Sequence, residues 1–124
     1  MDLLPRSAPD RQTISAYGDG GFRISGTHWQ QPMLVMPSQS LPWPVNALAE
    51  ASIANLQPLL GQEPAVELLL LGCGASVAAL PKGLRADLKA QGIALEPMNT
   101  GAACRTYNLL MLESRRVAAA LLPI

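Results

Sequence analysis

A nearly uninterrupted apolar run, AVELLLL at residues 65–71, constrains the fold more than any other feature of the chain. A strand with one face in water alternates apolar and polar side chains, whereas a strand covered on both faces is apolar throughout. Gly72, Cys73 and Gly74 follow directly. The sequence therefore predicts a central strand that leaves its sheet through a glycine turn, in an α/β fold with layers on both sides.

The chain after this run alternates between helical and strand patterns. Leu84 and Leu88 give the next segment one apolar face, and Gly92 stands where a glycine commonly ends a helix. A strand, a helix and a strand in this order favour a right-handed parallel βαβ unit, so we expect the first two strands to be parallel neighbours. The predicted elements are a helix over 82–92, a strand over 93–98, a helix over 100–114 that begins at Asn99 or Thr100, and a strand over 116–123.

The front of the chain is richer in strand patterns. An Asp-Gly pair between the first two strands suits a tight hairpin turn, because glycine adopts positive φ cheaply. Residues 1–12 are predicted to be a flexible arm, and residues 13–124 a single domain. Trp43 lies between two prolines and either covers the edge of the core or, if exposed, anchors a partner. The predicted elements are strands over 13–17, 22–26 and 32–37, a turn over 26–28 that contains His28, and a helix from Asn46 to about Leu60.

Composition excludes several classes of function. Nine basic residues balance nine acidic ones and aromatic residues make up 4%, so we expect no nucleic-acid binding. The longest apolar stretch, residues 68–80, is too short to span a bilayer, and the first residues lack the apolar segment of a secretory signal. We therefore expect a cytoplasmic protein without a transmembrane segment. The two cysteines form no metal-binding motif.

The glycine turn raises the question of a nucleotide site. Gly72 and Gly74 after a strand, with Glu96 at the end of the next, resemble part of a dinucleotide fingerprint. However, Val77 stands at the third glycine position, and too few βαβ units remain for a cofactor domain. We expect a structural turn, no cofactor, and no tight binding of NAD, ATP or S-adenosylmethionine.

The segment NTGAACRTYN, residues 99–108, is the candidate functional surface. The start of a helix attracts anions and lowers the pKa of a nearby thiol. Parallel strands also deliver their C-terminal loops to one sheet edge, where ligands of α/β proteins bind. The sequence thus leaves open an anion site, a thiol or redox pair, and two buried structural cysteines. The candidate residues are Gly72, Cys73, Gly74, Asn99, Thr100, Cys104, Arg105, Tyr107 and Asn108.

The segments YGDGGFRISG, ELLLLGCG and GIALEPMNTGAACRTYNLLMLESRRVAAALLP, in this order, resemble one family of small domains. This family includes mitochondrial complex I (NADH:ubiquinone oxidoreductase) assembly factor 3 and uncharacterised bacterial and archaeal proteins. The resemblance covers about residues 14–123, and its most specific parts are the G-x-G after the apolar strand and the A-C-x-T-Y-N of residues 103–108. Other members often carry a polar residue between the two glycines, so Cys73 departs from their pattern.

The resemblance implies a three-layer α/β fold with a central mixed, partly parallel sheet, flanking helices and an N-terminal β-hairpin layer. It also implies a non-catalytic assembly or interaction role with a protein partner, near the respiratory membrane, without a cofactor. The alternative is a small-molecule or anion binder, or an enzyme, that uses the loop edge formed by residues 72–74 and 99–104. The first hypothesis needs an apolar surface patch, for example at Trp43 or the last helix, and the second needs a pocket between the two loops.

Overall fold

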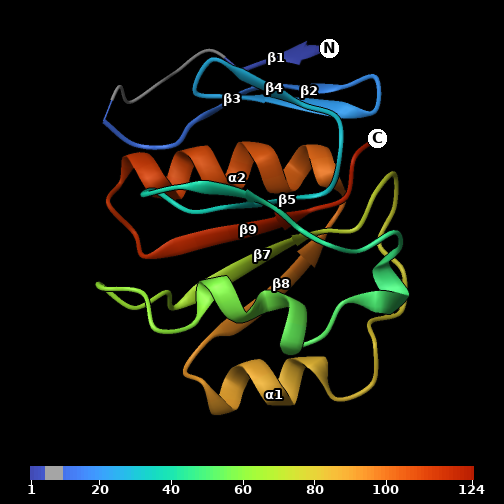
Figure 1. Cartoon of the computed structure of the whole chain (residues 1–124), viewed down its shortest axis with the longest axis vertical. Helices are drawn as coiled ribbons and strands as arrows, with labels where there is room; N and C mark the ends of the chain where they lie inside the picture. Colours follow the sequence, from blue (N-terminus) through green and yellow to red (C-terminus); the bar gives the residue numbers. More distant parts are fainter. Residues whose placement is uncertain (5–9) are drawn as a thin grey trace.

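A computed structural model of the chain describes residues 1–4 and 10–124. Within this part, the strands form two sheets (Figure 1). The first is a four-stranded antiparallel sheet, which contains the predicted N-terminal hairpin. Its order is β1 (Asp2–Leu3), β2 (Ile14–Gly18), β3 (Gly21–Ile24) and β4 (Thr27–Trp29).

The second sheet is mixed and has five strands. Its order is β6 (Ser40–Pro42), β5 (Met33–Val35), β9 (Val117–Leu121), β7 (Leu68–Gly72) and β8 (Ala94–Met98). Strand β7 runs parallel to β8 and β9, and Leu69 pairs with Leu95, which confirms the predicted parallel neighbours. Proline donates no ladder hydrogen bond, and the prolines of this sheet, Pro42 and Pro97, lie in the two edge strands.

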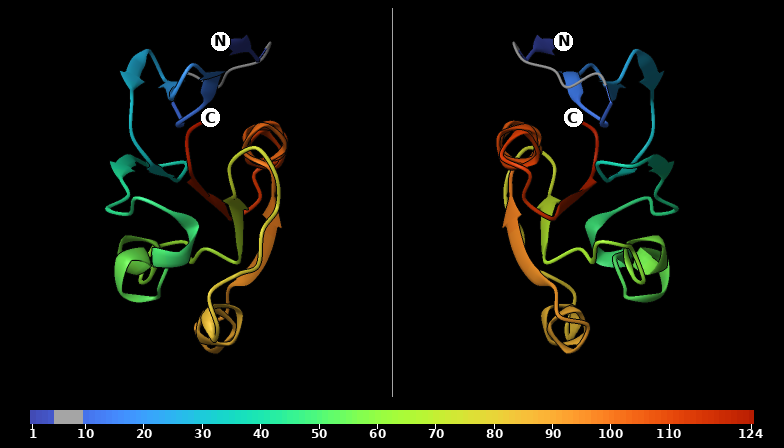
Figure 2. Two further views of the ribbon diagram at one scale, coloured as in Figure 1. Left: turned by 90° about the vertical axis from the view of Figure 1, so that its right-hand side faces the viewer. Right: turned by 90° about the vertical axis from the view of Figure 1, so that its left-hand side faces the viewer.

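Layers cover both faces of the second sheet (Figure 2). Leu70 points into one core with helix α2 (Thr100–Leu112) and the first sheet. Its neighbours Leu69 and Leu71 point into the other core with α1 (Leu84–Ala90) and the 3-10 helices η1 (Leu48–Glu50) and η2 (Ala54–Leu59). The uninterrupted leucines of β7 are therefore buried on both faces, and the predicted three-layer α/β class is confirmed.

The predicted helix from Asn46 is wrong. Two short 3-10 helices replace it, and the side chain of Asn46 does not cap the first of them. Asn55 is the physical reason, since its Oδ1 accepts from the backbone nitrogen of Ser52 at 3.1 Å and from Nε1 of Trp43 at 3.0 Å. A short polar side chain that bonds to nearby groups competes with helical hydrogen bonds, and Pro58 removes one more donor.

The turn predicted over residues 26–28 is formed instead by Ser25 and Gly26. Ser25 and Gly26 both have positive φ, 45° and 85°, which suits a two-residue hairpin turn. Thr27 already pairs with Ile24, so His28 lies in edge strand β4 opposite Arg23 rather than in a turn. Its side chain is exposed.

The N-terminal segment contacts the domain on both sides of residues 5–9, which lie outside the described residues. Asp2 pairs with Tyr17 in the first sheet. Further along, Nη1 of Arg11 donates to the carbonyl oxygen of Met111 at 2.7 Å, at the end of α2. The predicted domain boundary at residue 13 remains a prediction.

Candidate functional site

The two loops that were predicted to form a functional edge do meet. The backbone nitrogen of Cys73 donates to the carbonyl oxygen of Met98 at 2.8 Å, and that of Thr100 donates to the carbonyl oxygen of Gly74 at 2.9 Å. In return, the backbone nitrogen of Gly74 donates to Oγ1 of Thr100 at 2.9 Å. The topological prediction holds because β7 and β8 are parallel and end at the same edge.

The polar groups of these loops form hydrogen bonds with each other and with the C-terminal segment. Oγ1 of Thr100 also donates to the carbonyl oxygen of Leu122 at 2.7 Å. Asn99 caps α2, since its Oδ1 accepts from the backbone nitrogen of Ala102 at 2.8 Å. At Gly72, an added Cβ would lie 2.9 Å from Leu121 and 3.1 Å from Oγ1 of Thr100. This glycine therefore permits close packing of the chain, and these contacts close the space between the two loops.

Arg105 also has a protein partner. Its Nη1 donates to the hydroxyl oxygen of Tyr17 at 2.7 Å. That hydroxyl lies over the first turn of α2, where a Cβ added to Gly101 would lie 2.8 Å from it. The first sheet thus covers the start of the helix with Tyr17. The first turn of α2 therefore lies against the Tyr17 hydroxyl, and Nη1 of Arg105 is directed at the same oxygen.

The cysteines do not form a pair. Cys73 lies in the core with α1, whereas Cys104 lies in the core with α2, on the opposite face of the sheet. Cys104 is 0% exposed, and burial raises the pKa of its thiol to about 12, because the attraction of the Arg105 charge is the smaller effect. Burial likewise raises the pKa of Cys73. Of the alternatives left open, two buried structural cysteines agree with these positions, whereas a thiol or redox pair does not.

Tyr107 and Asn108 bind the N-terminal segment to α2. The hydroxyl of Tyr107 donates to the carbonyl oxygen of Gln12 at 2.8 Å, and the side-chain amide of Asn108 bonds to the backbone of Ile14. Burial raises the pKa of Tyr107, and the nearby Arg11 opposes this shift only in part. Both residues therefore hold α2 against the segment that leads into the first sheet.

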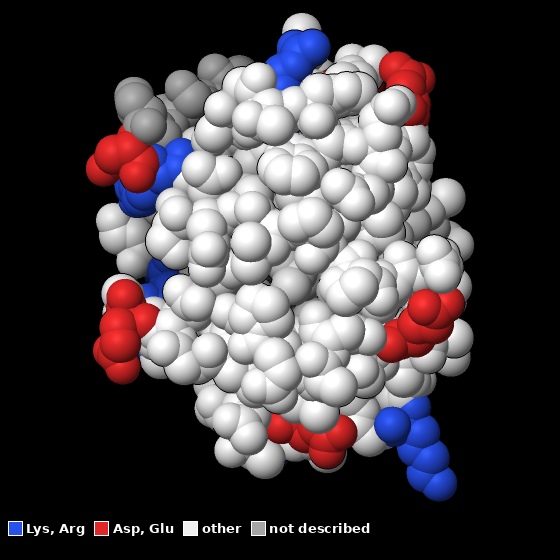
Figure 3. Space-filling view, viewed as in Figure 1, with Lys and Arg blue, Asp and Glu red and all other residues white. Residues whose placement is uncertain are grey.

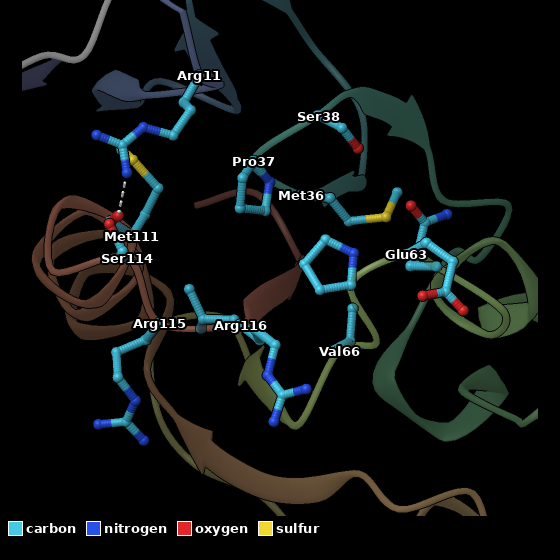
Figure 4. A pocket seen from close by; sticks show the side chains of 13 residues that line it. Arg11, Met36, Pro37, Ser38, Glu63, Val66, Met111, Ser114, Arg115 and Arg116 are labelled. Atoms are coloured by element: carbon cyan, nitrogen blue, oxygen red, sulfur yellow. Dashed lines mark hydrogen bonds between the residues drawn. The ribbon is translucent and has the colours of Figure 1, made fainter.

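A hollow that the sequence did not predict lies at the opposite end of the sheet (Figure 4). It has a volume of about 260 Å³, with an apolar floor and the arginine side chains along one side. Its walls come from five separated segments, so no local motif marks it. Arg116 donates to Oε2 of Glu67 at 2.8 Å. The lining residues are Arg11, Met36, Pro37, Ser38, Gln62, Glu63, Pro64, Val66, Met111, Ser114, Arg115, Arg116 and Val117.

One face of the molecule is almost free of charge. Between Arg23 and Glu63, the only Asp, Glu, Lys or Arg is Glu50. This segment forms β4, β5, β6, η1 and η2, which lie toward the viewer in Figure 1. The same view in Figure 3 shows a wide uncharged area with charged side chains around its rim. The spacing of charges along the sequence was the signal that would have revealed this face.

The two places suggested for an apolar surface patch, Trp43 and the last helix, differ in solvent exposure. Trp43 is buried, with 1% of its surface exposed, so it cannot act as an exposed anchor. On α2, Leu109 is 58% exposed.

No helix in the described part of the chain is long and apolar enough to cross a membrane. The described residues also contain no group of three or more His, Cys, Asp or Glu side chains placed to hold a metal ion.

A four-stranded antiparallel sheet packed with α2 onto a five-stranded mixed sheet defines an Mth938-like α/β domain. A solved structure of such a domain from Bordetella pertussis is similar, with a TM-score of 0.79 and 32% identity over 99% of this chain and 92% of that one. Residues 14–122 match the family described as "protein of unknown function (DUF498/DUF598)". The chain belongs to this family, as the sequence resemblance predicted.

Two relatives place the chain within the family. An uncharacterised protein of Rhodobacter capsulatus is 45% identical over 111 residues, which are 90% of this chain and 84% of that protein. The NADH dehydrogenase [ubiquinone] 1 alpha subcomplex assembly factor 3 of Danio rerio is 35% identical over 123 residues, which are 99% of this chain and 71% of that protein. The relatives of this chain thus include an uncharacterised bacterial protein and an assembly factor of NADH dehydrogenase [ubiquinone].

Proposed function

We propose that this protein is a non-catalytic, protein-binding assembly factor that acts on a respiratory complex. The observation that carries the proposal is the 35% identity to the Danio rerio assembly factor over 99% of this chain. Similarity over 99% of this chain covers every layer of the domain rather than one motif, and this extent supports a shared role. We further propose a cytoplasmic location and peripheral association with a membrane complex.

The contacts of the candidate residues support a structural rather than a chemical role. Thiols at Cys73 and Cys104 are buried on opposite faces, where the neutral form is favoured. The alternative, a small-molecule or anion site or an active site at residues 72–74 and 99–104, has less support, since the backbone groups there already bond to each other. Whether this edge binds a ligand remains a prediction.

Exchange of domains tests the proposal. In cells that lack the Danio rerio factor, a chimera would carry this chain in place of the matched region of that factor. Assembled NADH dehydrogenase is then measured on native gels. We expect the chimera to restore at least one third of the assembled enzyme that the unaltered factor restores.

The control chimera carries Leu70→Arg, which places a charge in the core at a residue with 1% exposure. It should restore nothing. If the unaltered chimera accumulates to the level of the natural factor yet restores no assembled enzyme, the proposed function is wrong for this chain.

A further inference from the structure

We propose that the uncharged face, defined as the exposed residues of the segment 24–62, is the surface that binds the partner protein. We also propose that the partner is a different protein whose contact surface is itself uncharged, apart from a Lys or Arg opposite Glu50. This inference rests on the proposed function, because it names the surface that such an assembly factor would use. Its exposed members outside the hairpin turn include Gln30, Gln31, Gln39, Pro42, Pro44, Asn46, Ala49, Gln57 and Pro58.

The distribution of charge is the first argument. Charged residues make up 15% of the chain, but only Glu50 falls in this segment, so the remaining charges crowd the rest of the molecule. Ordinary surfaces mix both signs of charge, and the central part of a protein interface is depleted in charged residues. A solvent-exposed face with a single charged residue (Figure 3) thus has the composition of an interface core.

The rigidity of the face is the second argument. Pro42 and Pro44 flank Trp43, whose side chain is buried and whose Nε1 donates to Asn55. The backbone nitrogen of Trp43 donates to the carbonyl oxygen of Pro32 at 2.8 Å, which holds the end of β6 against the start of β5. Prolines lose little conformational freedom on binding, so the segment 42–44 adds little to the entropic cost of docking a partner.

The open edge of β6 indicates how the partner docks. Successive backbone groups of a strand point alternately to the two sides. The backbone nitrogen of Trp43 donates inward to Pro32, so the backbone groups of Leu41, two residues earlier, also point inward toward Leu34. Ser40 and Pro42 therefore point outward, and Pro42 has no N–H to donate. An added strand would find few donors, so we infer that the partner contacts side chains rather than extending the sheet.

The chemistry of the partner follows from the cost of burying charge. A charged side chain pressed against this face would lose water without gaining an ion partner, except at Glu50. A second copy of this chain supplies no cation from its own face, since neither Lys nor Arg occurs between Arg23 and Lys82. Two copies would bring two unpaired Glu50 carboxylates into one interface, whereas a different protein is free to offer a cation.

Site-specific crosslinking in the source organism tests the surface directly. A photo-crosslinking amino acid replaces Gln57 on the uncharged face or, as a matched control, Gln91 after α1; both glutamines are exposed. We expect irradiation to yield one discrete crosslinked protein from position 57 and at least tenfold less from position 91. Mass spectrometry of the crosslinked peptide should show a segment of a different protein without charged residues at the site of attachment.

Charged substitutions on the same face provide the second arm. Gln39→Glu and Gln39→Lys, each combined with the crosslinker at position 57, should both reduce the crosslink at least tenfold, because either sign would be buried unpaired. Gln91→Glu and Gln91→Lys should leave it unchanged. An absent crosslink at position 57, equal crosslinks at both positions, a peptide of this same chain, attachment in a charged segment, or insensitivity to the Gln39 charges would each overturn the proposal.

The two proposals fail in different ways. If the chimera restores enzyme assembly both with and without Gln39→Lys, the proposed function stands and the proposed binding surface is wrong. A discrete crosslink at position 57 in a chain whose chimera restores nothing keeps the surface and removes the respiratory role.

Discussion

The side-chain amide of Asn108 bonds to both backbone polar groups of Ile14. Its Oδ1 accepts from the backbone nitrogen at 3.0 Å, and its Nδ2 donates to the carbonyl oxygen at 2.7 Å. Ile14 begins β2, where the pairing with β3 shifts register between Ile14 and Ala16. A helix side chain therefore takes the place of a strand partner and joins α2 to the first sheet.

Replacing this amide should destabilise the fold. Asn108→Ala leaves a buried donor and a buried acceptor of Ile14 without partners, and we expect a loss of about 2–4 kcal/mol in the free energy of unfolding. Asn108→Asp should cost a similar amount, because a carboxylate accepts from the nitrogen but donates nothing to the oxygen. Urea denaturation followed by circular dichroism provides the measurement. The exposed Gln91→Ala should change stability by less than about 0.5 kcal/mol, and equal losses in Gln91→Ala and Asn108→Ala would contradict this role.

The order of helices and strands around the second sheet was largely predictable. The uninterrupted run from Leu68 to Leu71 predicts a buried strand, and the four-residue spacing of Leu84 and Leu88 predicts a helix. The side of the sheet that each helix covers was not predictable. Right-handed crossovers put α1 and α2 on opposite faces only because β9 lies beyond β7 from β8. Strand order is set by packing across the whole domain, so the sequence alone did not separate Cys73 from Cys104.

The helix predicted from Asn46 is wrong for a different reason, which lies in local hydrogen bonds rather than in strand order. Its apolar spacing matched a helix, yet the hydrogen bonds of Asn55 to Ser52 and Trp43 favour two short 3-10 helices. Such competition depends in part on the contact between Asn55 and Trp43, which lie 12 residues apart, and the periodicity of apolar residues does not report it. The candidate loops followed from topology, whereas their closure by Thr100 depends on one hydroxyl whose partners only the structure shows.

The hydroxyl of Thr100 gives a second prediction. Thr100→Val keeps the shape of the side chain but removes the partner of the Gly74 nitrogen and of the Leu122 oxygen. We expect a loss of about 1–3 kcal/mol in the free energy of unfolding, measured by urea denaturation. Thr100→Ser retains the hydroxyl and should lose less than Thr100→Val. A valine variant as stable as the natural protein would show that the joint between the two loops does not depend on this group.

Gly101 gives a third prediction with an unusual sign. Glycine to alanine usually stabilises a helix by about 1 kcal/mol, but here the new Cβ would lie 2.8 Å from the Tyr17 hydroxyl. We expect Gly101→Ala to destabilise the protein by about 1–3 kcal/mol through overpacking. In a Tyr17→Phe background the same change should cost less, because the nearest atom is gone. Thermal denaturation of the four variants of this cycle gives the comparison, and a stabilised Gly101→Ala protein would contradict the close contact.

The Cys104 thiol predicts how stability responds to alkaline pH. Burial raises its pKa from an ordinary value of 9.0 to about 12 in the folded protein. Above pH 9 the unfolded chain therefore loses a proton that the folded chain keeps, so the free energy of unfolding falls by up to about 1.4 kcal/mol per pH unit from this group. Tyr107 acts in the same direction at higher pH, since burial raises its pKa as well.

Cys104→Ala removes only the contribution of the thiol, and we expect the stability of this variant to fall less steeply than that of the natural protein between pH 9 and pH 10.5. Urea denaturation at four pH values measures both slopes, with a thiol-alkylation assay at pH 8 to confirm that Cys104 does not react in the folded protein. Parallel slopes, or rapid alkylation without unfolding, would show that this thiol is accessible and that its position in the core is wrong.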